Sequence, residues 1–311
     1  LTPLVGREAD VAGALGALGN HRLVTITGLG GVGKTALAQT IARWRNGDQA
    51  QDDNFVRWIE VFGSSLQLHA TPLSIADVFR KQVTETSRSW VFTSATLSVN
   101  GDFKHYCGEL GLDEAQTATW PSPFDFEHQA LLYVPKAMPN PNTREYTAAV
   151  VKAALPVLMA SEGRAFLLFT SLRAMREASE LVREEFKARG LDYPVLTQGE
   201  GSRTELLDRF RALGNAVLVA SQSFWEGVDV RGDALSVVVI DRLPFSPPDD
   251  PVLAARIDKM NREGRNAFME YQVPQAVITL KQGAGRLIRD ETDRGVLMIC
   301  DPRLVDKPYG K

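Results

Sequence analysis

A glycine-rich run near the beginning of the sequence has the residue types and the spacing of a phosphate-binding loop. The run GLGGVGKT (28–35) fits the pattern GxxxxGK[ST]; it follows a short apolar stretch (22–27) and precedes a stretch of helical composition (34–44). In such a loop glycine N–H groups turn inward on phosphates, the lysine neutralises the β- and γ-phosphates, and the threonine ligates Mg²⁺. The predicted ATP and Mg²⁺ site consists of Gly28, Gly30, Gly31, Gly33, Lys34 and Thr35.

A nucleoside triphosphatase also needs a carboxylate on a neighbouring strand to hold the magnesium ion. Asp241 in VVVIDR and Asp301 in LMICDPR each follow an apolar stretch, and Glu60 lies within RWIEVF. None of these acids is followed by a second acid, and the chain contains no DEAH or DECH sequence. We interpret Asp241 and Asp301 as turn residues at strand ends, and we expect nucleotide hydrolysis to be slow or absent.

Two arginines near the end of the chain have a spacing suited to phosphate chemistry. The run QGAGRLIR is predicted to be helical, so Arg286 and Arg289, at positions i and i+3, lean the same way. Gly285, directly before Arg286, has no side chain and would let another backbone segment approach closely. Two guanidinium groups directed into a cleft between domains would stabilise a γ-phosphate in its transition state. The alternative is a solvated basic face paired with the acids that follow.

Hydroxyl side chains follow two of the predicted strands. Thr170 and Ser171 come after AFLLF, and Ser221 and Ser223 come after AVLVA. Such residues can donate hydrogen bonds to a nucleic-acid backbone, or they can cap the helices that follow. Trp225 can stack on a base, or it can pack beneath its own loop.

Composition sets limits on the class of protein. The chain has 311 residues, 44% of them hydrophobic, a net charge of -3 and two cysteines. No apolar run reaches the ~18 residues of a membrane span, and the start lacks the features of a signal peptide. We therefore expect a cytoplasmic protein without membrane contact. The net charge gives no global attraction to nucleic acid, although a local groove can still bind it.

Strand and helix segments alternate over the second half of the chain. Strands are predicted at 129–134, 165–170, 193–198, 216–220, 236–240 and 295–300, with helices between them, including a long helical pattern at about 250–290. This alternation predicts an α/β fold, a mostly parallel sheet with helices on both faces. Ser202 with Glu205 predicts a capping box. Earlier in the chain we predict a polar linker (45–54), a hairpin (RWIEVF with LQLHATPL) and a buried strand (SWVFTSATL).

Four segments in order resemble motifs III to VI of superfamily 2 helicases: TSATL (93–97), GRAFLLFTSLRAM (163–175), SQSFWEGVDVRGDAL (221–235) and ITLKQGAGRLIRDETDRG (278–295). Together they resemble the DinG/YoaA-type DNA helicases of the XPD branch, over about residues 54–311. The resemblance implies a RecA-like fold, with the tail of motor domain 1 at 55–127 and all of motor domain 2 at 128–311. It also implies an ATP-dependent helicase that moves 5′ to 3′ on single-stranded DNA, in DNA repair.

The same resemblance implies roles for individual residues. Catalysis would involve Gln282, Arg286 and Arg289, and the nucleotide side of motif V would contain Glu226, Gly227 and Asp229. The nucleic-acid contacts would be Thr170, Ser171, Ser221, Ser223 and Trp225. Motif III, Ser94 to Thr96, would connect the two motor domains. The family's iron–sulfur insertion has no counterpart in this sequence, so we expect no iron–sulfur cluster in this chain.

The first 44 residues resemble a different family. VGRE, a short helical stretch and the glycine loop are similar to the start of STAND-type signalling ATPases, the NB-ARC-like domains. The two resemblances therefore predict a P-loop segment (1–44) joined to the tail of helicase motor domain 1 and all of motor domain 2. Two alternatives to a helicase stay open: a signalling P-loop ATPase, and a nucleic-acid-binding helicase fragment without catalysis.

Overall fold

The computed structural model describes residues 23–27, 54–61, 65–224, 230 and 232–310 of the chain. Its residues cluster in two compact units that do not follow chain order. The sheet unit comprises Thr93–Phe103, Gln116–Phe245 and Tyr271–Lys311, and the N-terminal unit takes the remaining segments. Most of the predicted P-loop segment and linker lies outside the described residues, so the predicted domain limits stay a prediction.

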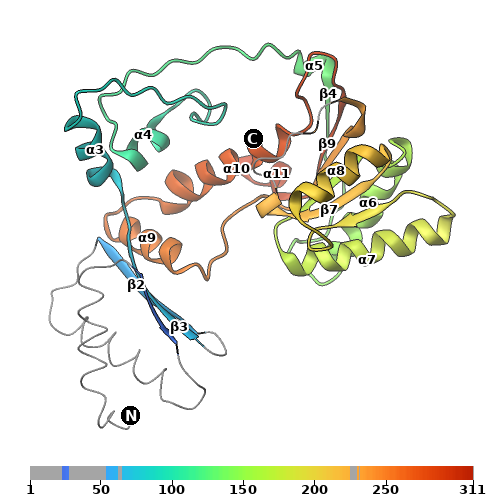
Figure 1. Ribbon diagram of the computed structural model, residues 1–311, viewed down its shortest axis with the longest axis horizontal. Helices are drawn as coiled ribbons and strands as arrows, with labels where there is room; N and C mark the ends of the chain where they lie inside the picture. Colours follow the sequence, from blue (N-terminus) through green and yellow to red (C-terminus); the bar gives the residue numbers. More distant parts are fainter. Residues whose placement is uncertain (1–22, 28–53, 62–64, 225–229, 231, 311) are drawn as a thin grey trace, which may run out of the picture. The chain divides into compact units, whose positions relative to one another are not determined.

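The sheet unit contains one six-stranded sheet in the order β4-β9-β8-β5-β7-β6, and every neighbouring pair of strands is parallel (Figure 1). Its strands are β4 (Ala130–Tyr133), β5 (Ala165–Phe169), β6 (Val195–Thr197), β7 (Val217–Ser221), β8 (Val237–Ile240) and β9 (Gly295–Ile299). Five of the six lie within segments predicted as strands, and β7 extends one residue beyond its predicted segment, 216–220. Continuous apolar runs are typical of strands buried on both faces, which is the state of β5, β7 and β8.

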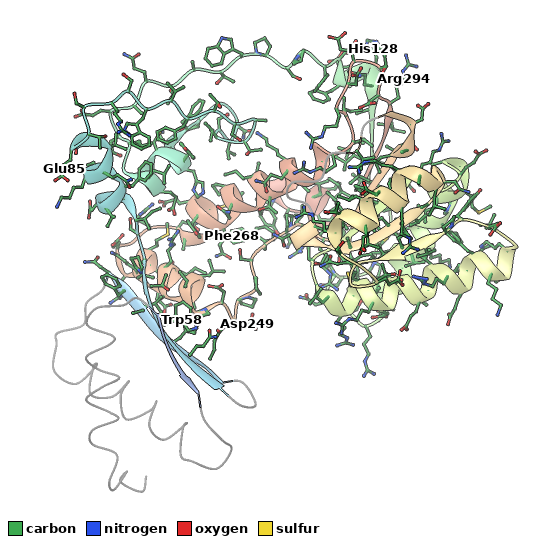
Figure 2. The ribbon with its side chains drawn as sticks, viewed as in Figure 1. Trp58, Glu85, His128, Asp249, Phe268 and Arg294 are labelled. Atoms are coloured by element: carbon green, nitrogen blue, oxygen red, sulfur yellow. The ribbon has the colours of Figure 1, made fainter. Side chains whose placement is uncertain are left out.

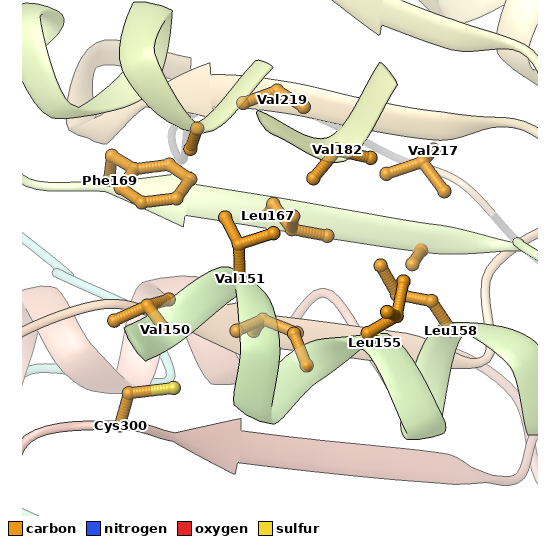
Figure 3. Packing of buried hydrophobic residues seen from close by; sticks show 14 of the residues in the cluster. Val150, Val151, Leu155, Leu158, Leu167, Phe169, Val182, Val217, Val219 and Cys300 are labelled. Carbon is orange, nitrogen blue, oxygen red and sulfur yellow. The ribbon is translucent and has the colours of Figure 1, made fainter. Parts of the chain in front are cut away.

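Helices cover both faces of this sheet, as predicted. The helices of this unit are α5 (Phe126–Gln129), α6 (Tyr146–Ala160), α7 (Leu172–Arg189), α8 (Arg203–Leu213), α10 (Val273–Ala284) and α11 (Arg303–Asp306). Of these, α6 and α7 pack on one face of the sheet, and α8 and α10 pack on the other. Because strand side chains alternate between faces, Leu167 packs with α6 and α7, while its neighbour Phe166 packs with α8. Figure 3 shows Val151 of α6 and Val182 of α7 beside Leu167 on the first of these faces.

The helix ends of the sheet unit follow local sequence signals. Ser202 and Glu205 form the predicted capping box at the start of α8. At the end of α7, Gly190 adopts φ 65°, the left-handed conformation in which glycine commonly terminates a helix. These local signals set the residues at which α7 ends and α8 begins.

The N-terminal unit contains an antiparallel sheet in the order β1-β3-β2. Its strands are β1 (Leu23–Thr27), β2 (Phe55–Val61) and β3 (Ser65–Pro72). The predicted hairpin is confirmed as β2 and β3, and it holds Glu60 on a strand where Glu60 contacts His69 at 3.1 Å. The strand before the glycine loop, β1, pairs antiparallel with β3. It therefore belongs to this separate sheet and not to the parallel sheet.

Three helices complete the described part of the N-terminal unit: α3 (Ala76–Thr84), α4 (Lys104–Leu110) and α9 (Pro251–Arg262). The Arg80 side chain of α3 donates to the Gly111 carbonyl group and to Asp113 just beyond α4. Arg256 of α9 forms a 2.6 Å ion pair with Glu109. The Arg80 contacts join residues 31 and 33 positions apart, and the Arg256 pair joins residues 147 positions apart.

Two predictions of secondary structure are wrong. The segment SWVFTSATL (89–97) forms no strand, and Val91 is 83% exposed. A strand needs a partner for its backbone hydrogen bonds, and no described strand pairs with this segment. The long helical pattern is interrupted after α9 at Gly264, which has φ 76°, before a short π-helix (Phe268–Gln272) leads into α10.

Candidate functional site

The carboxyl ends of parallel strands meet at one edge of a sheet, and a buried carboxyl group lies there after β8. Asp241 is 1% exposed, and its Oδ1 accepts hydrogen bonds from the backbone N–H groups of Thr170 (2.9 Å) and Arg242 (2.7 Å). Burial raises the pKa of Asp241 to about 7, although Arg242 and the two N–H donors lower it. Asp241 therefore links the loop after β5 to the loop after β8.

A second buried carboxylate, Asp301, stands after β9 at the same edge. Its oxygens accept from the Leu243 N–H group at 2.8 Å and from two nitrogens of the Arg303 side chain at 2.7 and 3.1 Å. Asp241 thus binds N–H groups in its own loop and in the loop after β5, and Asp301 binds an N–H group in the loop after β8. Their interpretation as strand-end turn residues is confirmed.

Tyr146 of α6 completes the support beneath this edge. Its hydroxyl group donates to the Asp241 carbonyl oxygen at 2.7 Å, and burial raises the pKa of this phenol, so that it stays protonated. The guanidinium group of Arg242 lies 4.9 Å from the centre of the Tyr146 ring, a cation–π contact. Buried polar contacts at this edge therefore join the start of α6 to the residues that follow β5 and β8.

The predicted nucleic-acid hydroxyls that the structure describes lie at this carboxyl edge. Ser171 caps α7, because its Oγ accepts from the Ala174 N–H group at 3.2 Å, as expected for the capping alternative. Ser221 is buried, and its N–H and hydroxyl groups donate to Gln198 Oε1 at 2.8 and 3.0 Å. Thr170 is half-buried beside Asp241. A nucleic-acid role for these residues stays a prediction.

The predicted arginine pair does not lie on a helix, which corrects the sequence interpretation. Helix α10 ends at Ala284, Arg286 lies in the turn after it, and Arg289 lies in irregular backbone. The last turn tightens through i to i+3 hydrogen bonds, and the buried side chains of Leu287 and Ile288 then anchor the chain in the core. The two arginines, both half-buried, flank this apolar anchor.

Gln282, predicted to act with the arginines, is half-buried on the last turn of α10. The glycine after that turn has a role different from the one predicted. A Cβ atom at Gly285 would lie 3.0 Å from the Lys281 carbonyl oxygen of its own helix, so the crowding is within α10. Lys281 in turn donates to the Ser98 carbonyl oxygen at 3.2 Å, which links α10 to the segment after motif III. In motif III itself, Ser94 Oγ accepts from the Thr96 N–H group in a local turn.

The loop that carries the arginines (285–294, the motif VI loop) is held by two buried side chains that the sequence interpretation missed. Asp293 accepts from the N–H groups of Arg289 and Asp290, and Gln129 donates to carbonyl groups of the same loop. The contact from Gln129 joins residues 161 positions apart or more, so no local pattern could reveal it. The turn-forming composition of DETDRG was the one available signal for Asp293.

The amino ends of β4, β8 and β9 form the edge opposite the hydroxyls. Ala130, Gly295 and Val237 begin these strands, in adjacent register. Figure 2 labels His128 and Arg294, the chain neighbours of Gln129 and Asp293, close together at this edge. The motif V loop (222–235) leaves β7 at the carboxyl edge and enters β8 at the amino edge. The motif V loop therefore runs from the edge with the hydroxyls to the amino end of β8, which is the parallel neighbour of β9, the strand that follows the motif VI loop.

Several predicted site residues lie outside the described residues. These are Gly28, Gly30, Gly31, Gly33, Lys34, Thr35, Trp225, Glu226, Gly227 and Asp229, together with the side chain of Ser223. Across the described ranges, no group of three or more His, Cys, Asp or Glu side chains is arranged to hold a metal ion. No described helix is both long and apolar enough to cross a bilayer.

The parallel sheet, its covering helices and the arginine-bearing loop define a RecA-like helicase motor domain. A solved XPD helicase has the same fold, with a TM-score of 0.56 at 18% identity, over 88% of this chain and 48% of that one. The chain belongs to the helicase C-terminal domain family, whose model matches residues 154–311.

Two curated relatives identify the branch of the family. The chain is 50% identical over 253 residues to the ATP-dependent DNA helicase YoaA of Escherichia coli, which covers 81% of this chain and 39% of that protein. It is 38% identical over 252 residues to the ATP-dependent helicase DinG of Mycobacterium tuberculosis, covering 78% of this chain and 36% of that protein. The predicted resemblance to the C-terminal region of DinG/YoaA-type helicases is confirmed. The chain spans about two fifths of the length of these relatives.

Proposed function

We propose that this chain is the C-terminal motor portion of an ATP-dependent DNA helicase, which couples ATP hydrolysis to movement on single-stranded DNA. The observation that carries the proposal is the arrangement of the sheet unit. Predicted nucleic-acid residues lie at the carboxyl edge, and the arginines lie in the motif VI loop. The motif V loop leaves β7 beside the former and is hydrogen-bonded at Gly232 to Asp293 of the motif VI loop. The names of the YoaA and DinG relatives support the same function. A cytoplasmic role in DNA repair is part of the proposal.

The nucleotide in this proposal is ATP with Mg²⁺, bound by the glycine loop from Gly28 to Thr35. Among the described residues, Arg286 and Arg289 fit a triphosphate. Buried side chains form hydrogen bonds to the backbone of their loop and so hold it in place. Guanidinium groups so supported can neutralise charge on the γ-phosphate without a large reorganisation. Glu226 and Asp229 of the motif V loop complete the proposed nucleotide side. When bound, Mg²⁺ would neutralise phosphate oxygens beside Thr35.

The nucleic acid in this proposal is single-stranded DNA at the carboxyl edge. The Ser171 cap places the amino end of an 18-residue helix, α7, at this edge, and helix amino ends favour phosphate groups. Thr170 stands beside it, on the loop that Asp241 holds. Trp225 of the motif V loop is the proposed stacking side chain. A strand bound here would contact the loop that leads toward the arginines.

ATP turnover with and without single-stranded DNA tests the proposal. Lys34→Ala removes the lysine of the glycine loop, and Arg289→Ala removes one guanidinium group of the motif VI loop. Arg294→Ala is the matched control, because Arg294 is an exposed arginine of the same loop. We expect DNA-stimulated turnover in the wild type and in Arg294→Ala, and its loss in both other variants.

The two alternative functions give different results in the same assay. Turnover that DNA does not stimulate would contradict the helicase proposal and favour a signalling P-loop ATPase. Absence of turnover, with salt-dependent DNA binding that Lys34→Ala leaves unchanged, would favour a helicase fragment without catalysis. The missing DEAH-type acid is the sequence feature in favour of this last outcome.

A further inference from the structure

A buried carboxylate, Asp293, binds backbone groups of two different loops. It is 8% exposed, and its Oδ2 accepts from the N–H groups of Arg289 at 2.7 Å and Asp290 at 2.9 Å. Its Oδ1 accepts from the Gly232 N–H group, 61 residues earlier in the chain, at 3.2 Å. One side chain therefore ties the motif V loop to the backbone of an arginine in the motif VI loop.

A second side chain fixes the same loop from the start of β4. Gln129 is 7% exposed, and its Nε2 lies 3.0 Å from the carbonyl oxygens of Asp290, Glu291 and Asp293. Three carbonyl acceptors around one atom require a donor, so the amide nitrogen and not its oxygen faces the loop. Gln129 thus satisfies carbonyl groups of the loop, while Asp293 satisfies its N–H groups.

These contacts matter because the arginines have lost the support of a helix. After α10 ends at Ala284, turn hydrogen bonds hold the N–H groups of Arg286 and Leu287, but Arg289 lies in irregular backbone before β9 begins at Gly295. A carboxylate that accepts N–H groups forms hydrogen bonds roughly twice as strong as those of a neutral acceptor. Asp293 therefore replaces, for Arg289, the backbone support that a helix would have given.

We propose that Asp293 is a positioning residue that couples the motif V loop to the motif VI arginines. A displacement of the motif V loop by bound DNA would move the Gly232 N–H group, the shared carboxylate and then the backbone of Arg289. This inference rests on the proposed function, because it describes how DNA contact alters ATP turnover. Asp293 touches neither nucleotide nor DNA in this scheme.

Asp293→Asn is the informative variant, because it keeps the shape of the side chain and removes one acceptor oxygen. An amide NH₂ group cannot accept, so either the Gly232 contact or the pair of contacts to Arg289 and Asp290 is lost. Asp290→Asn is the matched control. Asp290 is exposed in the same loop, and its carboxylate accepts local hydrogen bonds from the N–H and hydroxyl groups of Thr292.

The first readout is hydrogen exchange, which needs no turnover. In Asp293→Asn we expect faster exchange of the amides in both 230–235 and 286–294, and no such change in Asp290→Asn. In the wild type, adding single-stranded DNA should slow exchange in both segments. The proposal is overturned if the exchange of only one segment responds to Asp293→Asn, or if DNA changes exchange in 230–235 alone. The wild-type measurement decides even if the variant fails to fold.

The second readout is steady-state ATP turnover. In Asp293→Asn we expect the kcat of DNA-stimulated turnover to fall by about tenfold or more, since small misplacements of catalytic groups cost about this much or more. The turnover without DNA should fall less than the DNA-stimulated turnover, so that the ratio of the two rates drops. Simple unfolding would lower both rates alike and leave this ratio unchanged. Retained DNA stimulation in this variant would overturn the proposal. A wild type without DNA-stimulated turnover would contradict the proposed function instead, and hydrogen exchange would then decide the coupling.

Discussion

The buried carboxyl group of Asp241 makes the stability of the sheet unit depend on pH in a definite direction. Burial raises its pKa from 3.8 to about 7 in the folded chain. The folded state therefore binds the proton more tightly than the unfolded state does. The stability that this group contributes is fully present below about pH 4 and is lost as pH rises through about 7.

The size of the effect follows from the two pKa values. A difference of about three units between 3.8 and about 7 corresponds to roughly 4 kcal/mol over the whole titration. Between about pH 5 and about pH 8.5 the expected loss is roughly 3 kcal/mol, because the unfolded carboxyl group is already ionised at the lower pH. Asp241→Asn removes this loss while keeping Oδ1, the atom that accepts from Thr170 and Arg242.

Urea denaturation followed by far-UV circular dichroism measures the prediction. The free energy of unfolding is determined at both pH values for the wild type, Asp241→Asn and the control Asp192→Asn, which makes the same chemical change at an exposed site. We expect the wild type and the control to lose about 3 kcal/mol more than Asp241→Asn. Contributions of all other titrating groups cancel in this difference. Equal losses in the wild type and Asp241→Asn would refute the reasoning from burial.

Three further substitutions test the contacts that support the two edges. Ser171→Ala should lower the free energy of unfolding by about 1 kcal/mol, since α7 loses its cap, and urea denaturation should show no such loss in Ser171→Thr. Gly163→Ala should cost about 3 kcal/mol or more, because its φ is 82° and an added Cβ would collide with the Asn215 carbonyl oxygen; Gly190→Ala, left-handed but in open space, should cost only about 1 kcal/mol. Tyr146→Phe should cost about 1–2 kcal/mol by calorimetry, because its 2.7 Å hydrogen bond to a buried carbonyl oxygen is lost, and an unchanged Tm would contradict this.

The sheet unit was predictable because its signals are local and repeated. Strands of a parallel sheet are short runs of apolar residues, and each of the six strands of this sheet contains such a run. The capping box at Ser202 and the glycine that ends α7 likewise depend on only a few neighbouring residues. Turn residues such as Asp241 follow directly once the strand ends are known.

The errors have a common physical cause, which is dependence on distant partners. The segment 89–97 has the composition of a buried strand, but a strand forms only where another strand accepts its hydrogen bonds. The i, i+3 spacing of Arg286 and Arg289 suits a helix, but consecutive burial of Leu287 and Ile288 is satisfied better by an irregular loop. The carboxylate of Asp293 was overlooked because one of its partners lies 61 residues away.

The most direct test of the central claim measures single-stranded DNA affinity as a function of bound nucleotide. Fluorescence anisotropy of a labelled single strand gives the Kd with and without a non-hydrolysable ATP analogue, so that turnover is not required. We predict a change of about fivefold or more in Kd, which Arg289→Ala abolishes and Arg294→Ala preserves. By linkage, DNA must change the affinity for the analogue by the same factor. A wild-type Kd for DNA that is identical with and without the analogue would contradict the account.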